Sequence, residues 1–83
     1  MNIDKILEKA KDNPRNIRFT EMQKLIEAFG YRYRGGKGSH FVYKNAGVSE
    51  IMNLQEDKGM AKAYQVKDFL KILKKYNLQR MEE

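Results

Sequence analysis

The sequence predicts an α+β domain in which helices cover one face of a three-stranded antiparallel sheet. Residues 20–29 and 66–76 carry apolar side chains at helical spacing, and residues 31–55 carry the alternating and β-branched patterns of strands. Short glycine-containing turns join the strand segments, which favours antiparallel neighbours. A chain of 83 residues can bury one modest core, so we expect residues 1–83 to form a single domain.

An extra helix is predicted at the N-terminus, within residues 1–13. Apolar residues recur there with the i, i+3, i+4, i+7 spacing of one helix face, from Ile3 to Ala10. Pro14 should end this helix, because proline lacks an amide proton and disfavours helical geometry in the residue before it. The sequence leaves three roles open for the helix: extension of the core, docking of a partner, or self-association.

A second helix is predicted to begin at Thr20, because Thr20 and Gln23 have the spacing of a capping box. It should end at Phe29 or Gly30, since glycine readily adopts the left-handed conformation that closes many helices. The last helix follows Gly59 and has the strongest amphipathic pattern in the chain. The predicted core of these two helices consists of Leu25, Ile26, Phe29, Val66, Phe69, Leu70 and Leu73.

Three strands are predicted between these helices. The segment Tyr31–Arg34 alternates with period two, which would place its tyrosines on one face and its arginines on the other. Glycines then connect it to a second strand at Ser39–Lys44. A third strand is predicted at Ser49–Gln55, with Met52 and Leu54 on one face and Ile51 and Asn53 on the other. The alternative is an open helical bundle in which residues 49–55 form a loop.

The net charge of +6 favours anionic partners, of which nucleic acid and acidic protein segments are the common ones. No acidic residue occurs between Glu27 and Glu50. The cations in this interval form a basic block around the glycine turn, although a solvated surface without a ligand gives the same pattern. The basic block consists of Arg32, Arg34, Lys37 and Lys44.

His40 is the only histidine, and its side chain has an unperturbed pKa of about 6.5, suited to proton transfer near neutral pH. It follows the segment Gly35–Ser39, whose spacing matches neither a P-loop nor a dinucleotide-binding loop. One interpretation is a loop whose amides and Lys37 hold a phosphate beside His40. The other is a flexible hairpin tip with a surface histidine. One histidine and no cysteine predict neither a metal site nor a cofactor.

Two further groups of side chains have a structural and a functional interpretation. Aromatic residues near the basic block can belong to the core or stack on nucleobases. Lysines of the last helix can follow a phosphate backbone or solvate an exposed face. The two groups are Tyr31, Tyr33, Phe41 and Tyr43, and Lys67, Lys71, Lys74 and Lys75.

No apolar run approaches the roughly 18 residues of a membrane span, and the N-terminal residues lack the pattern of a signal peptide. We therefore expect a cytoplasmic protein without membrane association.

Three segments resemble a known family. Residues 16–19 (NIRF), 30–40 (GYRYRGGKGSH) and 62–70 (KAYQVKDFL) are similar to the HicA toxins of bacterial type II toxin–antitoxin systems. The resemblance covers residues 16–78, and its most specific part is Gly38-Ser39-His40. From the second helix onward, the predicted α-β-β-β-α order is also that of a double-stranded-RNA-binding domain.

The resemblance implies a metal-independent mRNA interferase, that is, an endoribonuclease, with a double-stranded-RNA-binding-domain-like fold. It implies that His40 is catalytic, that mRNA is the substrate, that a HicB-type antitoxin is the protein partner and that the toxin alone is monomeric. The chain departs from many members at Phe41, where they have a histidine or polar residue, and at 54–56, where they have a proline. A non-catalytic RNA-binding or protein-interaction domain of the same fold is the alternative. The residues expected to bind RNA are Arg32, Arg34, Lys37, Gly38, Ser39 and Lys44.

Overall fold

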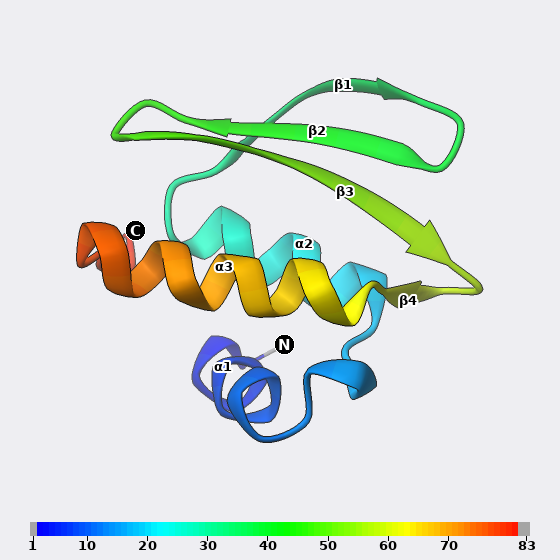
Figure 1. Cartoon of the computed structure of the whole chain (residues 1–83), viewed down its shortest axis with the longest axis horizontal. Helices are drawn as coiled ribbons and strands as arrows, with labels where there is room; N and C mark the ends of the chain where they lie inside the picture. The colour runs from blue at the N-terminus through cyan, green and yellow to red at the C-terminus, as the bar shows by residue number, and fades with distance from the viewer. Residues whose placement is uncertain (1, 82–83) are drawn as a thin grey trace.

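The structure, a computed structural model, describes residues 2–81 and confirms the α+β class (Figure 1). Its sheet has four strands where the sequence predicted three. Among residues 2–81, no helix is both long enough and apolar enough to cross a bilayer. The elements in chain order are α1 (Ile3–Asp12), the 3-10 helix η1 (Pro14–Asn16), α2 (Phe19–Ala28), β1 (Arg32–Lys37), β2 (His40–Asn45), β3 (Val48–Asp57), β4 (Met60–Ala61) and α3 (Ala63–Tyr76).

The strands form one antiparallel sheet in the order β1-β2-β3-β4. The third predicted strand is present and longer than expected. Its buried and exposed residues alternate as predicted, with Met52 and Leu54 buried and Ile51 exposed. The alternative in which residues 49–55 form a loop is therefore wrong.

The strand that the sequence did not predict, β4, follows a tight turn at Lys58 and Gly59. Both residues have positive φ, 53° and 81°, as a two-residue hairpin turn requires. The turn also joins the sheet to the start of α2, because the amide of Phe19 donates to the carbonyl of Gly59 at 2.9 Å. The amide of Ala61 donates to the carbonyl of Ile17, also at 2.9 Å.

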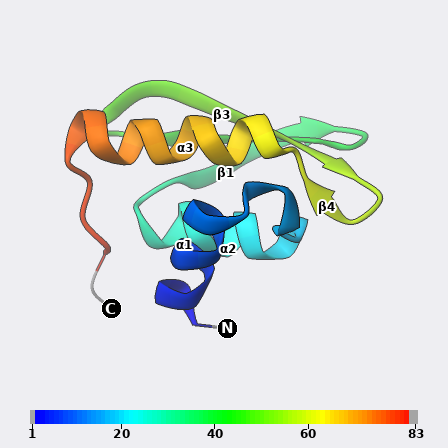
Figure 2. The ribbon, with the colours of Figure 1, turned by 60° about the horizontal axis from the view of Figure 1, so that its bottom comes forward.

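Helices α2 and α3 cover one face of the sheet, and α1 packs against them on the side away from the sheet (Figures 1 and 2). Helix α1 extends the core, because Ile6 and Ala10 are buried. Lys9 of this helix also forms an ion pair with Glu21 of α2 at 2.8 Å. Because α1 packs against α2 and α3, it needs an apolar face as regular as theirs.

Most of the core predicted for α2 and α3 is buried. Leu70 and Leu73 are corrections, because they are only partly buried and pack against the core from its margin. On α3 the residues with the least exposure include Ile72, which the predicted core left out. The buried members of the predicted core are Leu25, Ile26, Phe29, Val66 and Phe69.

Helix α2 begins at Phe19, with Arg18 as its N-cap residue, so the predicted start at Thr20 was wrong. The carboxylate of Glu21 accepts a hydrogen bond from the Arg18 amide at 2.9 Å. This bond satisfies one of the free amides at the helix start, the role expected of Gln23. The helix ends at Ala28, with Phe29 as its C-cap residue, which is one residue before the predicted end. Gly30 follows with a φ of 101°, the left-handed conformation expected of it.

Candidate functional site

The glycine-rich segment is a strand with a tight turn rather than a long loop. Strand β1 continues through Gly35 and Gly36 to Lys37, and the hairpin turn consists of Gly38 and Ser39. The register shifts between Tyr33 and Gly36, which makes a bulge, and Gly35 in the bulge has a φ of 106°. The predicted first strand, Tyr31–Arg34, therefore starts one residue too early and ends three residues too soon.

Gly36 is required by its contact with the neighbouring strand. A Cβ atom at this position would collide with the backbone carbonyl oxygen of His40. Gly38 has a φ of 60°, so it adopts the left-handed conformation that suits the turn. The glycines thus allow β1 and β2 to approach closely just before His40.

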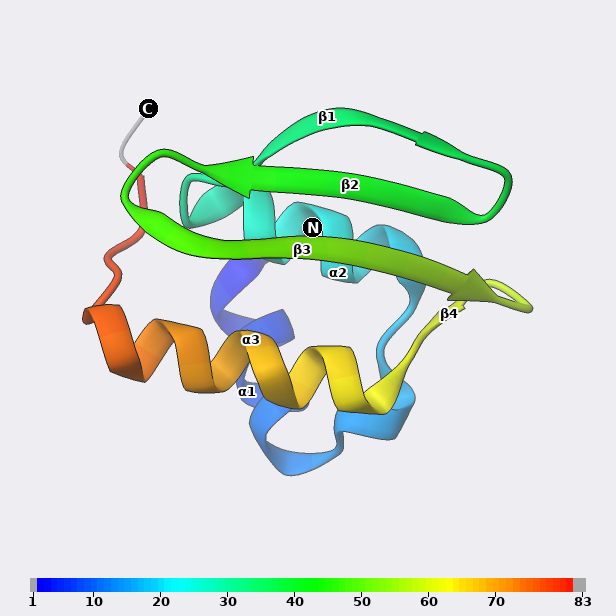
Figure 3. The same ribbon diagram turned by 45° about the horizontal axis from the view of Figure 1, so that its top comes forward.

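His40 is the first residue of β2. Because strand residues alternate between faces and the next residue, Phe41, packs on Phe19 of α2 with the two rings 4.9 Å apart, the His40 side chain lies on the other face of the sheet. The ribbon in Figure 3 shows that the helices cover only one face. The Cα partners of His40 are Lys37 on β1 and Gln55 on β3, and paired residues of an antiparallel sheet share a face. His40 is exposed, and no hydrogen bond or ion pair within residues 2–81 holds its ring. A ligand can therefore reach the imidazole from solvent.

Lys37 is the cation of the basic block that lies beside His40. It is exposed and directly opposite His40 in the hairpin. Arg34 is also exposed and lies in the bulge at the sheet edge. Lys37 and the turn residues Gly38 and Ser39 therefore form the tip of the hairpin beside His40, and Arg34 lies farther back along the edge strand.

The remaining predicted RNA-binding residues, Arg32 and Lys44, pair with each other at the other end of the hairpin. Four positions separate Lys44 from His40 on β2, which corresponds to about 13 Å. The Arg32 guanidinium donates from Nη1 to the carbonyl oxygens of Glu27 and Tyr31, at 3.1 and 2.8 Å. It therefore stabilises the C-terminus of α2, and the structure does not bring it to His40.

Gln55 is a neighbour of His40 that the sequence did not single out. Its backbone amide donates to Oε1 of Gln65 at 3.0 Å, and Nε2 of Gln65 donates to the carbonyl of Asn53. Gln65 is the buried polar residue of α3, and this pair of bonds explains its burial. These two bonds fix the backbone of β3 at residues 53–55 against α3, and this part of β3 is the neighbour of His40.

The lysines of α3 belong to a different surface. Lys67, Lys71 and Lys74 are exposed on the helix that covers the opposite face of the sheet from His40. Lys75 forms an ion pair with Glu50 of β3 at 2.8 Å. These lysines are therefore not part of the site around His40.

Glu50 connects β3 to the end of α3. Besides Lys75, its carboxylate accepts hydrogen bonds from the hydroxyl of Tyr76 at 2.6 Å and from Ser49 at 3.0 Å. Lys75 and then Tyr76 stabilise the charged form most and lower the pKa of Glu50 to about 2.

The four aromatic residues near the basic block fall into two groups. Tyr31 and Tyr43 are buried, and burial raises the pKa of Tyr31 to about 12 and raises the pKa of Tyr43. Phe41 is partly buried, whereas Tyr33 is 53% exposed. The stacking interpretation therefore applies to Tyr33 alone among these four.

Among residues 2–81, no three potential ligands of the His, Cys, Asp or Glu type gather into a possible metal site. Comparisons with protein-family models, with curated proteins and with solved structures found no significant match to the chain.

Proposed function

We propose that this protein is a metal-independent endoribonuclease of the HicA toxin type, with mRNA as substrate and His40 as the catalytic residue. The observation that carries the proposal is the pairing of His40 with Lys37 at an exposed hairpin tip. An imidazole and an ammonium group on adjacent strands can supply two of the functions that RNA cleavage without metal uses. One transfers a proton, and the other offsets charge on the phosphate.

The arrangement of the hairpin supports this chemistry. Gly38 and Ser39 lie between the two groups in the chain, in the Gly-Ser-His motif on which the family resemblance rests. Backbone amides of such a turn can approach a phosphate closely, because Gly38 has no side chain. Arg34 adds positive charge at the edge, and binding of RNA through these cations should weaken as salt concentration rises.

The order from α2 to α3 also supports a double-stranded-RNA-binding-domain-like fold, with β4 and α1 as additions. A HicB-type antitoxin is then the protein partner, and the cytoplasm is the compartment in which a toxin of this kind meets mRNA. A short reading frame for a HicB-type protein next to the gene would strengthen this assignment.

A non-catalytic RNA-binding domain is the second candidate, and one observation favours it. Within residues 2–81, no hydrogen bond orients the imidazole of His40. Catalytic histidines are commonly held by a partner that fixes the tautomer. The two candidate functions differ in whether the imidazole of His40 transfers a proton during RNA cleavage.

Substitution of His40 tests the proposal. The variant His40→Ala should abolish RNA cleavage and growth arrest while retaining most of its RNA affinity, because affinity depends mainly on phosphate contacts by the cations. The variant Lys67→Ala, which alters an exposed cation on the opposite side of the sheet, serves as the control. Cleavage by His40→Ala at the unsubstituted rate would favour the non-catalytic candidate.

A further inference from the structure

Tyr33 is an exposed aromatic residue whose ring is contacted by two other aromatic rings. Its ring centroid lies 5.6 Å from that of Tyr43 at 62° and 6.3 Å from that of Phe41 at 45°. Both contacts come from β2, while 53% of the residue remains exposed. A ring in this position loses little conformational freedom when a ligand covers its open side, because its neighbours already restrict it.

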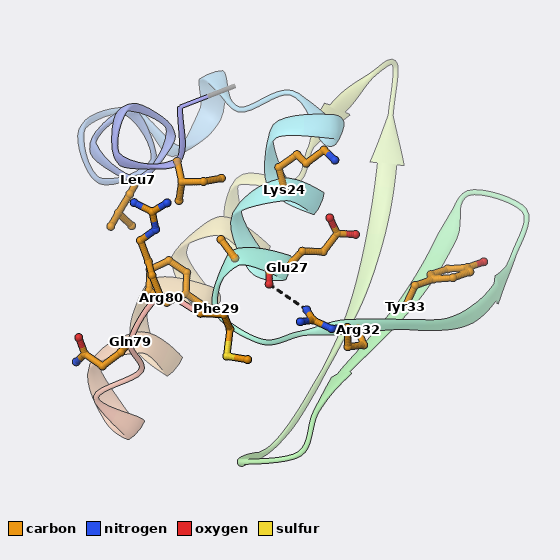
Figure 4. Close-up of a pocket in the computed structure, with 11 residues that line it drawn as sticks. Leu7, Lys24, Glu27, Phe29, Arg32, Tyr33, Gln79 and Arg80 are labelled. Carbon is orange, nitrogen blue, oxygen red and sulfur yellow. Dashed lines mark hydrogen bonds between the residues drawn. The ribbon is translucent and has the colours of Figure 1, made fainter. Parts of the chain in front are cut away.

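Tyr33 lies at the margin of a broad depression between α2, β1 and the C-terminal segment, and its ring points away from the other lining side chains, toward the hairpin (Figure 4). Lys24 and Glu27 of α2 line the depression together with Tyr33 and Arg32 of β1. Lys24 is exposed and forms no ion pair within residues 2–81. This margin of the depression therefore presents an aromatic ring and the cation Lys24, the two features that bind a nucleotide, together with the carboxylate of Glu27, which would repel a phosphate placed beside it.

We propose that Tyr33 stacks on a nucleobase of single-stranded RNA, and that Lys24 and Arg34 are the cations that bind the adjoining phosphates. This inference rests on the proposed function for the identity of the ligand as RNA. It also specifies the substrate class. Bases in an A-form duplex are stacked on each other, so a tyrosine ring can engage them only where the strand is unpaired.

An RNA strand that contacts both Tyr33 and His40 must pass around the edge of the sheet. Tyr33 pairs with Tyr43 and faces the helix side, whereas His40 faces the uncovered side. Strand β1 is an edge strand, and three positions separate Tyr43 from His40 on β2, or about 10 Å. Arg34 and the bulge lie between the two surfaces. A flexible single strand can follow this path, but a rigid duplex cannot bend around one strand of a sheet.

Binding to short RNA tests the inference, with His40→Ala as the common background so that the RNA is not cleaved. Fluorescence anisotropy compares a mixed-sequence single strand with the same strand annealed to its complement. The variant Tyr33→Ala should weaken single-strand binding by about 5- to 150-fold, the usual range for one lost base stack. Duplex binding should be unchanged, and Tyr33→Phe should bind as the parent does.

The matched control is Tyr64→Ala, since Tyr64 is 58% exposed on α3 and lies outside the depression. Equal single-strand affinity of the Tyr33→Ala and Tyr64→Ala proteins would overturn the inference. If Tyr33→Ala fails to fold by circular dichroism, single strands with abasic positions are bound to the parent instead. Undiminished affinity for the abasic strands would then overturn it. The proposed function fails separately, through cleavage that survives His40→Ala.

Discussion

Gly36 and His40 are in such close contact across the hairpin that any side chain at position 36 would strike the carbonyl oxygen of His40. The contact follows from the bulge in β1, which brings the end of the strand against β2. Gly36, which has no chemical role of its own, therefore constrains the backbone of His40.

The variant Gly36→Ala should consequently lose stability and move His40. Because the clash involves backbone atoms, the strands must separate, and we expect a loss of about 1–3 kcal/mol in the free energy of unfolding. Urea denaturation measures this loss. Gly47→Ala is the matched control, since its nearest contact would be the Asn45 side chain at 3.7 Å. A change within about 0.5 kcal/mol is expected there, and equal effects at the two glycines would contradict the role of the contact.

Glu50 makes the stability of the fold depend on pH. Its pKa is about 2 in the folded protein, against an ordinary value of 4.5. A depressed pKa stabilises the folded state above the ordinary value and loses that effect as pH falls from 4.5 to about 2. The variant Glu50→Gln should therefore be less stable than the unsubstituted protein at neutral pH and nearly equal to it near pH 2.

Urea midpoints at the two pH values check this expectation. Lys75 is exposed and Glu50 is partly exposed to solvent, so high salt should also reduce the difference at neutral pH. Tyr76→Phe removes one hydrogen bond to the same carboxylate and should give a smaller difference of the same sign. A stability difference that persists at low pH would mean that packing rather than charge is responsible.

Local patterns in the sequence predicted the elements whose side chains alternate regularly. Met52 and Leu54 point to the core and Ile51 to solvent because a strand alternates with period two. Strand β4 could not be found in this way. It has two residues, and its place depends on bonds between residues far apart in the sequence, such as that from Phe19 to Gly59.

The surroundings of the candidate site depend on strand register, which the sequence does not specify by itself. The bulge after Tyr33 decides that Lys37 rather than a neighbouring residue lies opposite His40. Gln55 became visible as a neighbour only once β2 and β3 were paired. Charge alone suggested four equivalent cations, but the fold places only Lys37 directly opposite His40, whereas Arg32 and Lys44 pair at the other end of the hairpin.

The proposed reaction follows from the pairing of His40 with Lys37. Metal-independent RNA cleavage ordinarily uses the 2′-hydroxyl as an internal nucleophile, which leaves a 2′,3′-cyclic phosphate. The 2′-oxygen forms a bond to phosphorus while the bond from phosphorus to the 5′-oxygen breaks, so the 2′-hydroxyl loses a proton and the leaving 5′-oxygen gains one. His40 would serve one of these two transfers as base or acid, and water would serve the other. Lys37, on the adjacent strand, would stabilise charge that develops on the phosphate. Lys44 carries the same charge on the same hairpin but lies at its far end.

Two lysine variants and one modified substrate therefore test the mechanism together. Lys37→Ala should reduce the cleavage rate with saturating RNA by about 100-fold, as loss of one preorganised donor does, whereas Lys44→Ala should mainly weaken binding. An RNA with a single 2′-deoxy position at the cut site should resist cleavage, and excess chelator should leave the rate unchanged. Equal rates for the two lysine variants would remove Lys37 from the reaction. Cleavage of the deoxy substrate would rule out internal attack, and loss of activity in chelator would make the enzyme metal-dependent.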